Sequence, residues 1–181
     1  YRMLYKTNPD ITRKNDAMKT DGFSVRCISN EVAVEKPECS NAYGTNQFTD
    51  CRDGQRYKTK VIGTQTWMAE NLRVTRFRNG DLISNETNLE KWGFFQIQTS
   101  AFCWYNNDVS NKNIYGALYN WYAASDNRNI APEGWHVATR EDWEKLENYM
   151  NPLRVYQSYC GNKLRETTTA HWRKSNGFFD N

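Results

Sequence analysis

The sequence predicts a small α+β domain with a core of aromatic rings and long polar loops, and three observations lead to this prediction. Four of the seven tryptophans lie between Phe102 and Trp143, and aromatic side chains bury the largest areas per residue. Short runs in which apolar residues alternate with polar ones indicate β-strands. Two other stretches carry apolar residues at helical spacing, which indicates α-helices.

The composition excludes several classes of protein. A chain of 181 residues is long enough for one domain, or for one domain with pieces of another, and its 14% of aromatic residues is too high for a disordered chain. The 24 basic and 21 acidic residues are scattered, and the densest basic group, Arg73, Arg76 and Arg78, is too short to indicate nucleic-acid binding. No apolar run approaches the ~20 residues of a membrane span, so none is expected in this chain.

The N-terminal region carries a strand pattern. Phe23, Val25 and Cys27 alternate with polar residues, which predicts a half-buried strand over residues 22–28. A second strand is predicted near the first five residues, joined to it by the long polar loop from Lys6 to Asp21. Because two strands alone are not stable in water, we expect them to complete a sheet that another part of the protein provides.

A linker separates these strands from the main domain. Residues 31–47 contain Pro37, Gly44 and a polar cluster without clear periodicity. We therefore divide the chain into residues 1–30, which are terminal strands, the linker at 31–47, and a domain at 48–181.

Strands and tight turns are predicted at the start of the main domain. Residues 57–61 and 65–68 read as strands, with a turn at Gly63 between them. The dipeptides Asp53-Gly54 and Asn79-Gly80 are typical of turns because glycine adopts positive φ without strain.

Two helices are predicted further along. The first covers Tyr115 to Ala124, where Tyr115, Leu118, Tyr119 and Tyr122 have helical spacing. The second starts at Thr139, a good N-cap residue, and ends before Pro152. The apolar stripe of this second helix comprises Trp143, Leu146 and Met150.

The cysteines leave two alternatives open. The five residues Cys27, Cys39, Cys51, Cys103 and Cys160 include no C-x-x-C pair, so zinc binding and thioredoxin-like chemistry are poorly supported. They are either buried thiols in a reducing compartment or disulfides in an oxidising one. A Cys39–Cys51 disulfide would close a polar loop and stabilise the fold by about 3 kcal/mol. The odd count leaves at least one cysteine free or paired with another chain.

Several long motifs are similar to one family. Residues 48–72, 103–122, 129–143 and 161–167 follow one another in the order seen in the Fibrobacter succinogenes major paralogous domain, so the resemblance covers most of 47–174. This resemblance implies a C-type-lectin-like or formylglycine-generating-enzyme-like fold, with two helices, small twisted antiparallel sheets and long loops. It also implies a bacterial protein exported to the cell surface or beyond.

One segment departs from the family order. The run Gly-Phe-Ser-Val-Arg-Cys at residues 22–27 is similar to the last strand of the family domain, yet here it precedes the domain, whose own final strands are missing. Three explanations stay open. The chain is cut from a tandem array, it is a circular permutant, or it is an assembly subunit whose first 30 residues complete a neighbour's sheet.

A cluster of oxygen-bearing side chains is the candidate metal site. Asn106, Asn107 and Asp108 lie in a row close to Ser110, and calcium takes oxygen ligands. The alternative is an Asx-rich turn that caps its own backbone. Calcium is the one cofactor that the sequence suggests.

An aromatic loop is the candidate ligand-binding site. Trp92, Phe94 and Phe95 lie together, and rings on a loop can stack on sugars or contact a partner protein. The alternative is a flap folded over the core.

No catalytic residue is predicted. His136, beside a helix start, is expected to be a packed, hydrogen-bonded histidine, and His171 has no visible partner. Glu70 and Asn71 are expected to pair with arginines or backbone donors. Cys103 and Cys160 do not lie in motifs that match those of the formylglycine-generating enzymes.

These observations favour a non-enzymatic extracellular or cell-surface bacterial domain, used for adhesion or as a structural subunit of an extracellular assembly, with possible strand exchange between copies. The expected partners are copies of the same domain and a polysaccharide or surface protein, and nucleic acid is not expected. The alternatives are a carbohydrate-binding module and an enzyme of the formylglycine-generating type.

Overall fold

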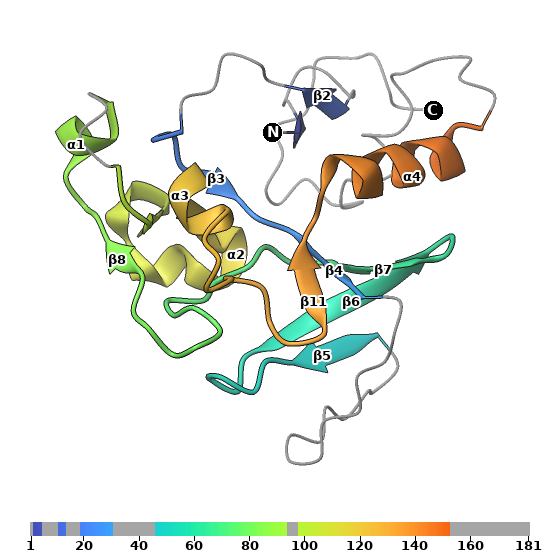
Figure 1. The fold of residues 1–181 in the computed structure, drawn as a ribbon, viewed down its shortest axis with the longest axis horizontal. Helices are drawn as coiled ribbons and strands as arrows, with labels where there is room; N and C mark the ends of the chain where they lie inside the picture. The colour runs from blue at the N-terminus through green and yellow to red at the C-terminus, as the bar shows by residue number, and fades with distance from the viewer. Residues whose placement is uncertain (1, 5–10, 14–18, 31–45, 94–97, 153–181) are drawn as a thin grey trace. The chain divides into compact units, whose positions relative to one another are not determined.

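The computed structural model describes residues 2–4, 11–13, 19–30, 46–93 and 98–152 (Figure 1). The chain forms two compact units, one made of Tyr1–Ala17 with Trp143–Asn181 and the other of Met18–Asp142. None of the helices in these ranges has the length and apolar character that a bilayer span requires.

The first unit contains a short antiparallel hairpin. Strand β1 (Arg2–Leu4) pairs with β2 (Ile11–Arg13), with Met3 opposite Thr12. The predicted pairing of the first residues with residues 22–28 is therefore wrong. The physical reason is proximity in the chain, because the β-branched residues Ile11 and Thr12 form a strand inside the stretch that was predicted to be a loop.

The second unit contains two sheets. The five-stranded sheet has the order β11-β4-β7-β6-β5, and all its pairings are antiparallel. Its strands are β4 (Cys27–Ser29), β5 (Gln47–Thr49), β6 (Arg56–Ile62), β7 (Gln65–Met68) and β11 (Trp135–Val137). The four-stranded sheet has the order β3-β10-β9-β8, in which only β8 and β9 are parallel. Its strands are β3 (Phe23–Ser24), β8 (Ser84–Asn85), β9 (Ala101–Trp104) and β10 (Ala117–Tyr119).

The α+β class is confirmed by these sheets and by short helices between and after the strands. The helical segments are α1 (Leu89–Gly93), the 3₁₀ turns η1 (Tyr105–Asn107) and η2 (Val109–Asn111), α2 (Lys112–Tyr115), α3 (Trp121–Ala124) and α4 (Arg140–Met150). The kinship with C-type lectins stays a prediction.

The strands predicted at residues 57–61 and 65–68 are confirmed as β6 and β7, and so are the predicted turns, whereas β5 was not predicted. Gly63 adopts φ +62° in the turn between β6 and β7, and Gly54 adopts φ +71° in the turn between β5 and β6. Gly80 also has positive φ, and its N–H donates to the Phe77 carbonyl at 3.0 Å. Glycine tolerates these conformations because it has no Cβ.

The strand predicted over residues 22–28 contributes to both sheets. Strand β3 pairs with β10 at the edge of one sheet, and β4 lies between β11 and β7 in the other. Val25 and Cys27 are buried, as the alternation predicted, whereas Phe23 is half-buried. In this structure the segment completes sheets of its own chain.

The predicted helix over residues 115–124 is wrong. Helix α2 ends at Gly116, whose φ of +70° and ψ of −163° are incompatible with a helix. The chain then forms β10, and a separate helix, α3, begins after Asn120, whose side chain accepts a hydrogen bond from the Ala123 N–H. The tyrosine spacing fits a strand followed by a helical turn as well as it fits one continuous helix, so periodicity could not separate the two.

Helix α4 confirms the second helix prediction. The Thr139 hydroxyl accepts from the Asp142 N–H at 3.3 Å, and the Asp142 carboxylate accepts from the Thr139 N–H at 2.8 Å. This reciprocal pair is a capping box, with aspartate in the place of the usual glutamate. Leu146 is buried, and the helix ends before Pro152.

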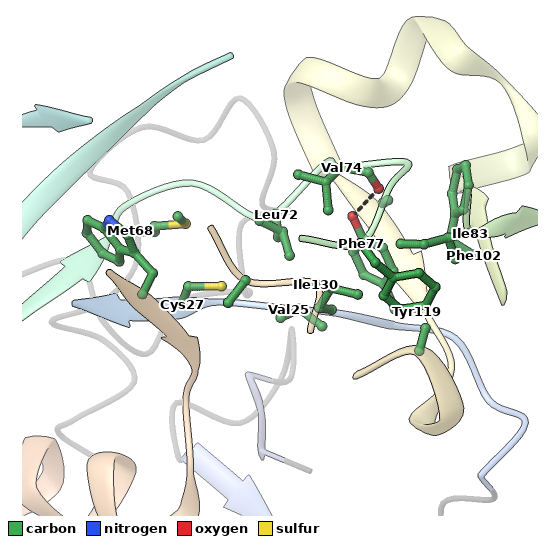
Figure 2. Close-up of a cluster of buried hydrophobic side chains, with 14 of the residues drawn as sticks. Val25, Cys27, Met68, Leu72, Val74, Phe77, Ile83, Phe102, Tyr119 and Ile130 are labelled. Atoms are coloured by element: carbon green, nitrogen blue, oxygen red, sulfur yellow. Dashed lines mark hydrogen bonds between the residues drawn. The ribbon is translucent and has the colours of Figure 1, made fainter. Parts of the chain in front are cut away.

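The core of the second unit is built largely from rings and aliphatic side chains. Figure 2 shows part of this cluster, including the hydrogen bond of 2.6 Å that the Tyr119 hydroxyl donates to the Val74 carbonyl. The full cluster comprises Val25, Cys27, Phe48, Tyr57, Met68, Leu72, Val74, Phe77, Ile83, Phe102, Trp104, Ala117, Tyr119, Ala123, Ile130, Ala131 and Trp135.

The predicted aromatic centre is therefore half of the core. Phe102 and Trp104 pack edge to face with centroids 5.2 Å apart, and Trp135 packs on Phe48 at 4.9 Å. Trp121, in contrast, is 44% exposed. The other half comes from residues 25–83, where the large apolar side chains are spread along the sequence and gave a weaker signal.

Candidate functional site

The segment from Tyr105 to Tyr115 leaves β9 as a compact loop and returns to β10. It consists of η1, η2 and α2. Asn106 and Asn107 adopt φ of +54° and +55°, a left-handed conformation that asparagine tolerates better than most residues. Two consecutive asparagines therefore explain the sharp turn at the tip of β9.

Side chains of this loop bind its own backbone and a neighbouring segment. The Asp108 carboxylate accepts from the Ser110 N–H at 2.9 Å, and Asn111 donates to the Tyr105 carbonyl at 3.1 Å. Asn107 donates to the Thr87 carbonyl at 2.9 Å. Hydrogen bonds from the backbone and hydroxyl of Ser110 lower the pKa of Asp108. Asp108 therefore forms the predicted Asx turn with its own backbone, whereas Asn107 binds a different segment.

The calcium prediction is neither supported nor excluded by this geometry. Within the described ranges, no group of three or more His, Cys, Asp and Glu side chains is placed to hold a metal ion. Asn106 and Asp108 are exposed, and one oxygen of Asp108 is already bound by Ser110. A calcium ion at this loop stays a prediction.

Three large apolar side chains of the loop face solvent. Tyr105 is 46% exposed, Val109 63% and Ile114 52%. The Tyr105 ring packs against the Tyr115 ring with centroids 4.9 Å apart, which restrains it. We call Tyr105, Val109 and Ile114 the loop surface. The sequence signal that we missed is the presence of these apolar residues within a polar, asparagine-rich stretch.

Trp92, predicted to bind a ligand, is half-buried. Its indole N–H donates to the Glu86 carbonyl at 2.9 Å, and a Cβ added to Gly22 would lie 3.3 Å from its ring. The ring therefore covers the backbone of Gly22, which is the flap alternative. Phe94 and Phe95 lie outside the described residues, so their role as ligand contacts stays a prediction.

His136 belongs to a hydrogen-bonded network at the start of α4. Its Nδ1 lies 2.7 Å from the Asn30 amide oxygen, and its Nε2 lies 2.9 Å from the Asp142 carboxylate. The Thr139 hydroxyl donates to the same carboxylate at 2.8 Å, so this hydroxyl is directed at the carboxylate and not at the imidazole. Burial raises the pKa of Asp142, but the bonds from Thr139 and His136 outweigh burial and hold it below its usual value. The histidine is packed and hydrogen-bonded, as expected.

Glu70 and Asn71 also have structural partners. The Glu70 carboxylate accepts from the Lys58 N–H at 2.6 Å and lies 4.0 Å from the Arg73 guanidinium. Asn71 accepts from Arg26 at 2.5 Å and donates to the Tyr115 carbonyl at 2.8 Å. These two residues connect β6, the loop after β7 and α2, and they leave no free acid–base pair.

The predicted basic group is dispersed. Arg73 is buried with its guanidinium 4.3 Å from the Tyr57 ring centroid. Arg78 donates to the carbonyls of Ala131, Pro132 and Trp135 at 3.0–3.2 Å. Because both side chains are used inside the fold, they form no exposed basic patch.

A small cavity lies where Arg78 approaches the turn before β6. Its lining residues are Phe48, Asp50, Cys51, Arg52, Arg78, Pro132 and Glu133. Asp50 is buried and its carboxylate lies 2.7 Å from Arg52, which also donates to the carbonyls of Arg76 and Ile130. These arginine contacts join three loops, and we assign this cavity a structural role.

The described thiols are unsuited to nucleophilic chemistry. Cys27 is a free, fully buried thiol, and burial raises its pKa to about 12. Cys103 is free and half-buried, and burial raises its pKa as well. Since the thiolate is the reactive form, burial lowers the reactivity of both thiols. Cys51 is disulfide-bonded, and because Cys39 lies outside the described residues, the Cys39–Cys51 pairing stays a prediction.

A comparison with sequence models of protein families shows to which family the chain belongs. Residues 61–180 of the 181 match the sequence model of the Fibrobacter succinogenes major domain, which is about two thirds of the chain. The chain belongs to this family. The match begins within β6, so β3 and β4 precede it. Searches of curated proteins and of solved structures each found no match.

Proposed function

We propose that the chain is a non-enzymatic, surface-exposed or secreted bacterial domain that serves in adhesion or as a structural subunit of an extracellular assembly. The observation that carries this proposal is the loop surface of Tyr105, Val109 and Ile114, held in place by the hydrogen bonds of its own loop.

The geometry of the loop suits binding. Fully burying a large apolar side chain is worth roughly 1.5–3 kcal/mol, so covering three partly exposed ones gives a useful share of a binding free energy. Because side-chain hydrogen bonds already order the loop, less conformational entropy is lost when a partner binds. The partners that we propose are copies of the same domain and a polysaccharide or surface protein.

A carbohydrate-binding module is the second candidate. Tyr105 presents an exposed ring next to the exposed polar side chains Asn106 and Asp108. Aromatic faces and adjacent hydrogen-bonding groups are what a sugar surface requires. Glycan-array binding that disappears in Tyr105→Ala, but persists in Trp92→Ala, would support this candidate. No binding across a broad array would count against it.

The formylglycine-generating type of enzyme is the third candidate, and among the described residues the burial of Cys27 and the partial burial of Cys103 give it no support. Purified protein assayed with cysteine-containing peptides for oxygen-dependent oxidation tests this directly. Reproducible turnover would overturn the non-enzymatic proposal.

The central experiment removes the loop surface. We expect the triple variant Tyr105→Ser, Val109→Ser, Ile114→Ser to lose about tenfold or more in affinity for immobilised copies of the protein or for extracellular polysaccharide, since a loss of ~1.4 kcal/mol corresponds to tenfold. The matched control is Tyr149→Ser, Val61→Ser, Leu82→Ser, which removes residues 63%, 61% and 66% exposed elsewhere. Equal losses in both variants would contradict a specific role of the loop.

A further inference from the structure

We propose that residues 19–30 are an exchangeable segment, which in an assembly completes the sheets of a second copy of this chain. This inference rests on the proposed function as an assembly subunit, and it names the partner.

The segment contributes an internal strand to one sheet and an edge strand to the other. Strand β4 pairs with β11 on one side, with Ile28 opposite His136, and with β7 on the other, with Ile28 opposite Trp67. Strand β3 pairs with β10 in the second sheet. Removing the segment would open edges on β7, β11 and β10, and open edges are templates for strand addition.

The side chains of the segment fill the core. Val25 is 7% exposed, Cys27 0% and Ile28 3%. Burial of apolar side chains is the main favourable contribution to folding, and domains are only marginally stable, so losing the burial of Val25 and Ile28 would remove a large part of that stability. A copy without the segment therefore needs a replacement in the same groove.

Backbone and side-chain hydrogen bonds fix the segment in one register. The Val25 carbonyl accepts from Leu72, and the Arg26 carbonyl accepts from Ala138, at 2.8 and 3.0 Å. The Arg26 guanidinium reaches Asn71 and the Met68 carbonyl at 2.5 and 3.1 Å. These bonds would position a segment from another chain just as well as the chain's own segment.

All these partners lie far along the chain. They begin at Trp67 and extend to His136 and Ala138, so the segment makes its strand pairings only with residues beyond a long connection. The connection between Asn30 and Asn46 comprises 15 residues, and its 16 Cα–Cα steps can extend to about 55 Å. This length exceeds the ~30 Å diameter of a small domain, so the connection can reach a neighbour.

Assembly favours exchange because it raises the local concentration of neighbouring copies. A segment tethered to its own domain acts at an effective concentration in the millimolar range, and this value falls as the connection lengthens. Copies held side by side in an assembly present their grooves at comparable concentrations. Exchange then costs little, because every contact of the segment is made again in the second copy.

Cross-linking in the full-length chain tests the proposal. In a Cys103→Ser background, one copy carries Ser24→Cys and the other Leu118→Cys, two positions that face each other across β3 and β10. Cys103 is replaced because it lies opposite Leu118 on the other side. The copies are mixed, unfolded in urea, refolded together at rising concentrations, oxidised, and measured by intact mass under non-reducing conditions.

We expect a disulfide-linked heterodimer of twice the 21.3 kDa chain mass, with a yield that rises with concentration. The control replaces Leu118→Cys by Lys60→Cys, which lies on exposed β6 away from β3 and should give only background linkage. Heterodimer at the control level at every concentration would overturn the proposal.

A second variant separates this inference from the proposed function. Ser24→Cys and Leu118→Cys in one Cys103→Ser chain should lock the segment into its own domain when oxidised. Light scattering should then show assemblies only after reduction. Assemblies that form equally well in the locked state would refute exchange, while sensitivity of binding to the loop-surface variant would still support adhesion.

Discussion

Gly116 offers a sharp test of how the loop surface is joined to the core. It lies between α2 and β10 with φ +70° and ψ −163°, a region of the backbone map that only glycine enters readily. A Cβ built on it would lie 2.6 Å from the Asn71 Cβ and 2.8 Å from the Leu72 carbonyl oxygen. We predict that Gly116→Ala strongly destabilises the second unit.

Two contributions determine the magnitude. The backbone conformation costs of order 1–3 kcal/mol for a non-glycine residue, and forcing an extra carbon into a packed site costs typically 1–3 kcal/mol more. The neighbours cannot withdraw freely, because the Leu72 carbonyl accepts from Ala117 at 2.9 Å and Asn71 donates to Tyr115. The expected loss is therefore about 2–6 kcal/mol, a large part of a typical stability.

Urea denaturation followed by tryptophan fluorescence measures this loss. Gly54→Ala is the matched control, because Gly54 has a φ of +71° but a Cβ there meets nothing within 4 Å. We expect the control to lose only the backbone contribution, so Gly116→Ala should unfold at a urea concentration lower by about 1 M or more, given typical m-values. Equal midpoints for the two variants would refute the close-packing argument.

Three further predictions follow from the core and the α4 cap. Tyr119→Phe should destabilise the protein by about 1–3 kcal/mol in urea denaturation, because the buried Val74 carbonyl loses its donor. The pKa of Asp142 is lower in the folded protein than in the unfolded chain, where it is about 3.9. The ionised carboxylate therefore stabilises the fold above pH ~3.9, and this stabilisation is lost as the pH falls through the folded-state pKa. Asp142→Asn should therefore destabilise the protein at neutral pH and lose this effect in acid, and a constant difference in urea midpoint across that range would contradict the assignment. Iodoacetamide at mildly alkaline pH should leave Cys27 unmodified in the native protein and modify Cys103 only slowly, whereas both thiols should react in urea. Intact mass measures the modification, and rapid modification of Cys27 in the native protein would show that this thiol is not buried.

Local signals in the sequence predicted local structure well. The turn at Gly63 and the strands on either side of it follow from residues that are neighbours in the chain, as does the cap of α4 at Thr139. In each case the residues that decide the conformation lie within four positions of one another, so periodicity and turn chemistry were sufficient.

Ambiguous local signals explain the wrong helix. Between Tyr115 and Ala124, tyrosines at helical spacing concealed a strand, because Ala117 and Tyr119 also alternate with a half-buried Leu118. Gly116 was the informative residue, since its positive φ ends α2. Only the approach of Asn71 and Leu72 shows why glycine is required there, and that approach involves residues more than 40 positions away.

The candidate functional site is the part of the structure that the sequence predicted least well. The asparagine cluster at 106–108 directed attention to the correct loop, but to its oxygen atoms and not to Tyr105, Val109 and Ile114. Trp92 was chosen for its type, whereas its burial depends on contact with Gly22, 70 positions earlier in the chain. Exposure of a side chain is a property of the whole fold, so composition alone could not rank these residues.

The central place of β4 also determines when the domain can finish folding. Ile28 pairs with Trp67, 39 residues later in the chain, and with His136, 108 residues later. At synthesis rates of roughly 5–20 residues per second, on the order of ten seconds separate the synthesis of Ile28 from that of His136. During this time β4 can pair with β7 but not with β11, so the five-stranded sheet is completed late and through non-local contacts, which is typical of high contact order. The order of synthesis therefore leaves β4 with one open edge until β11 has been made.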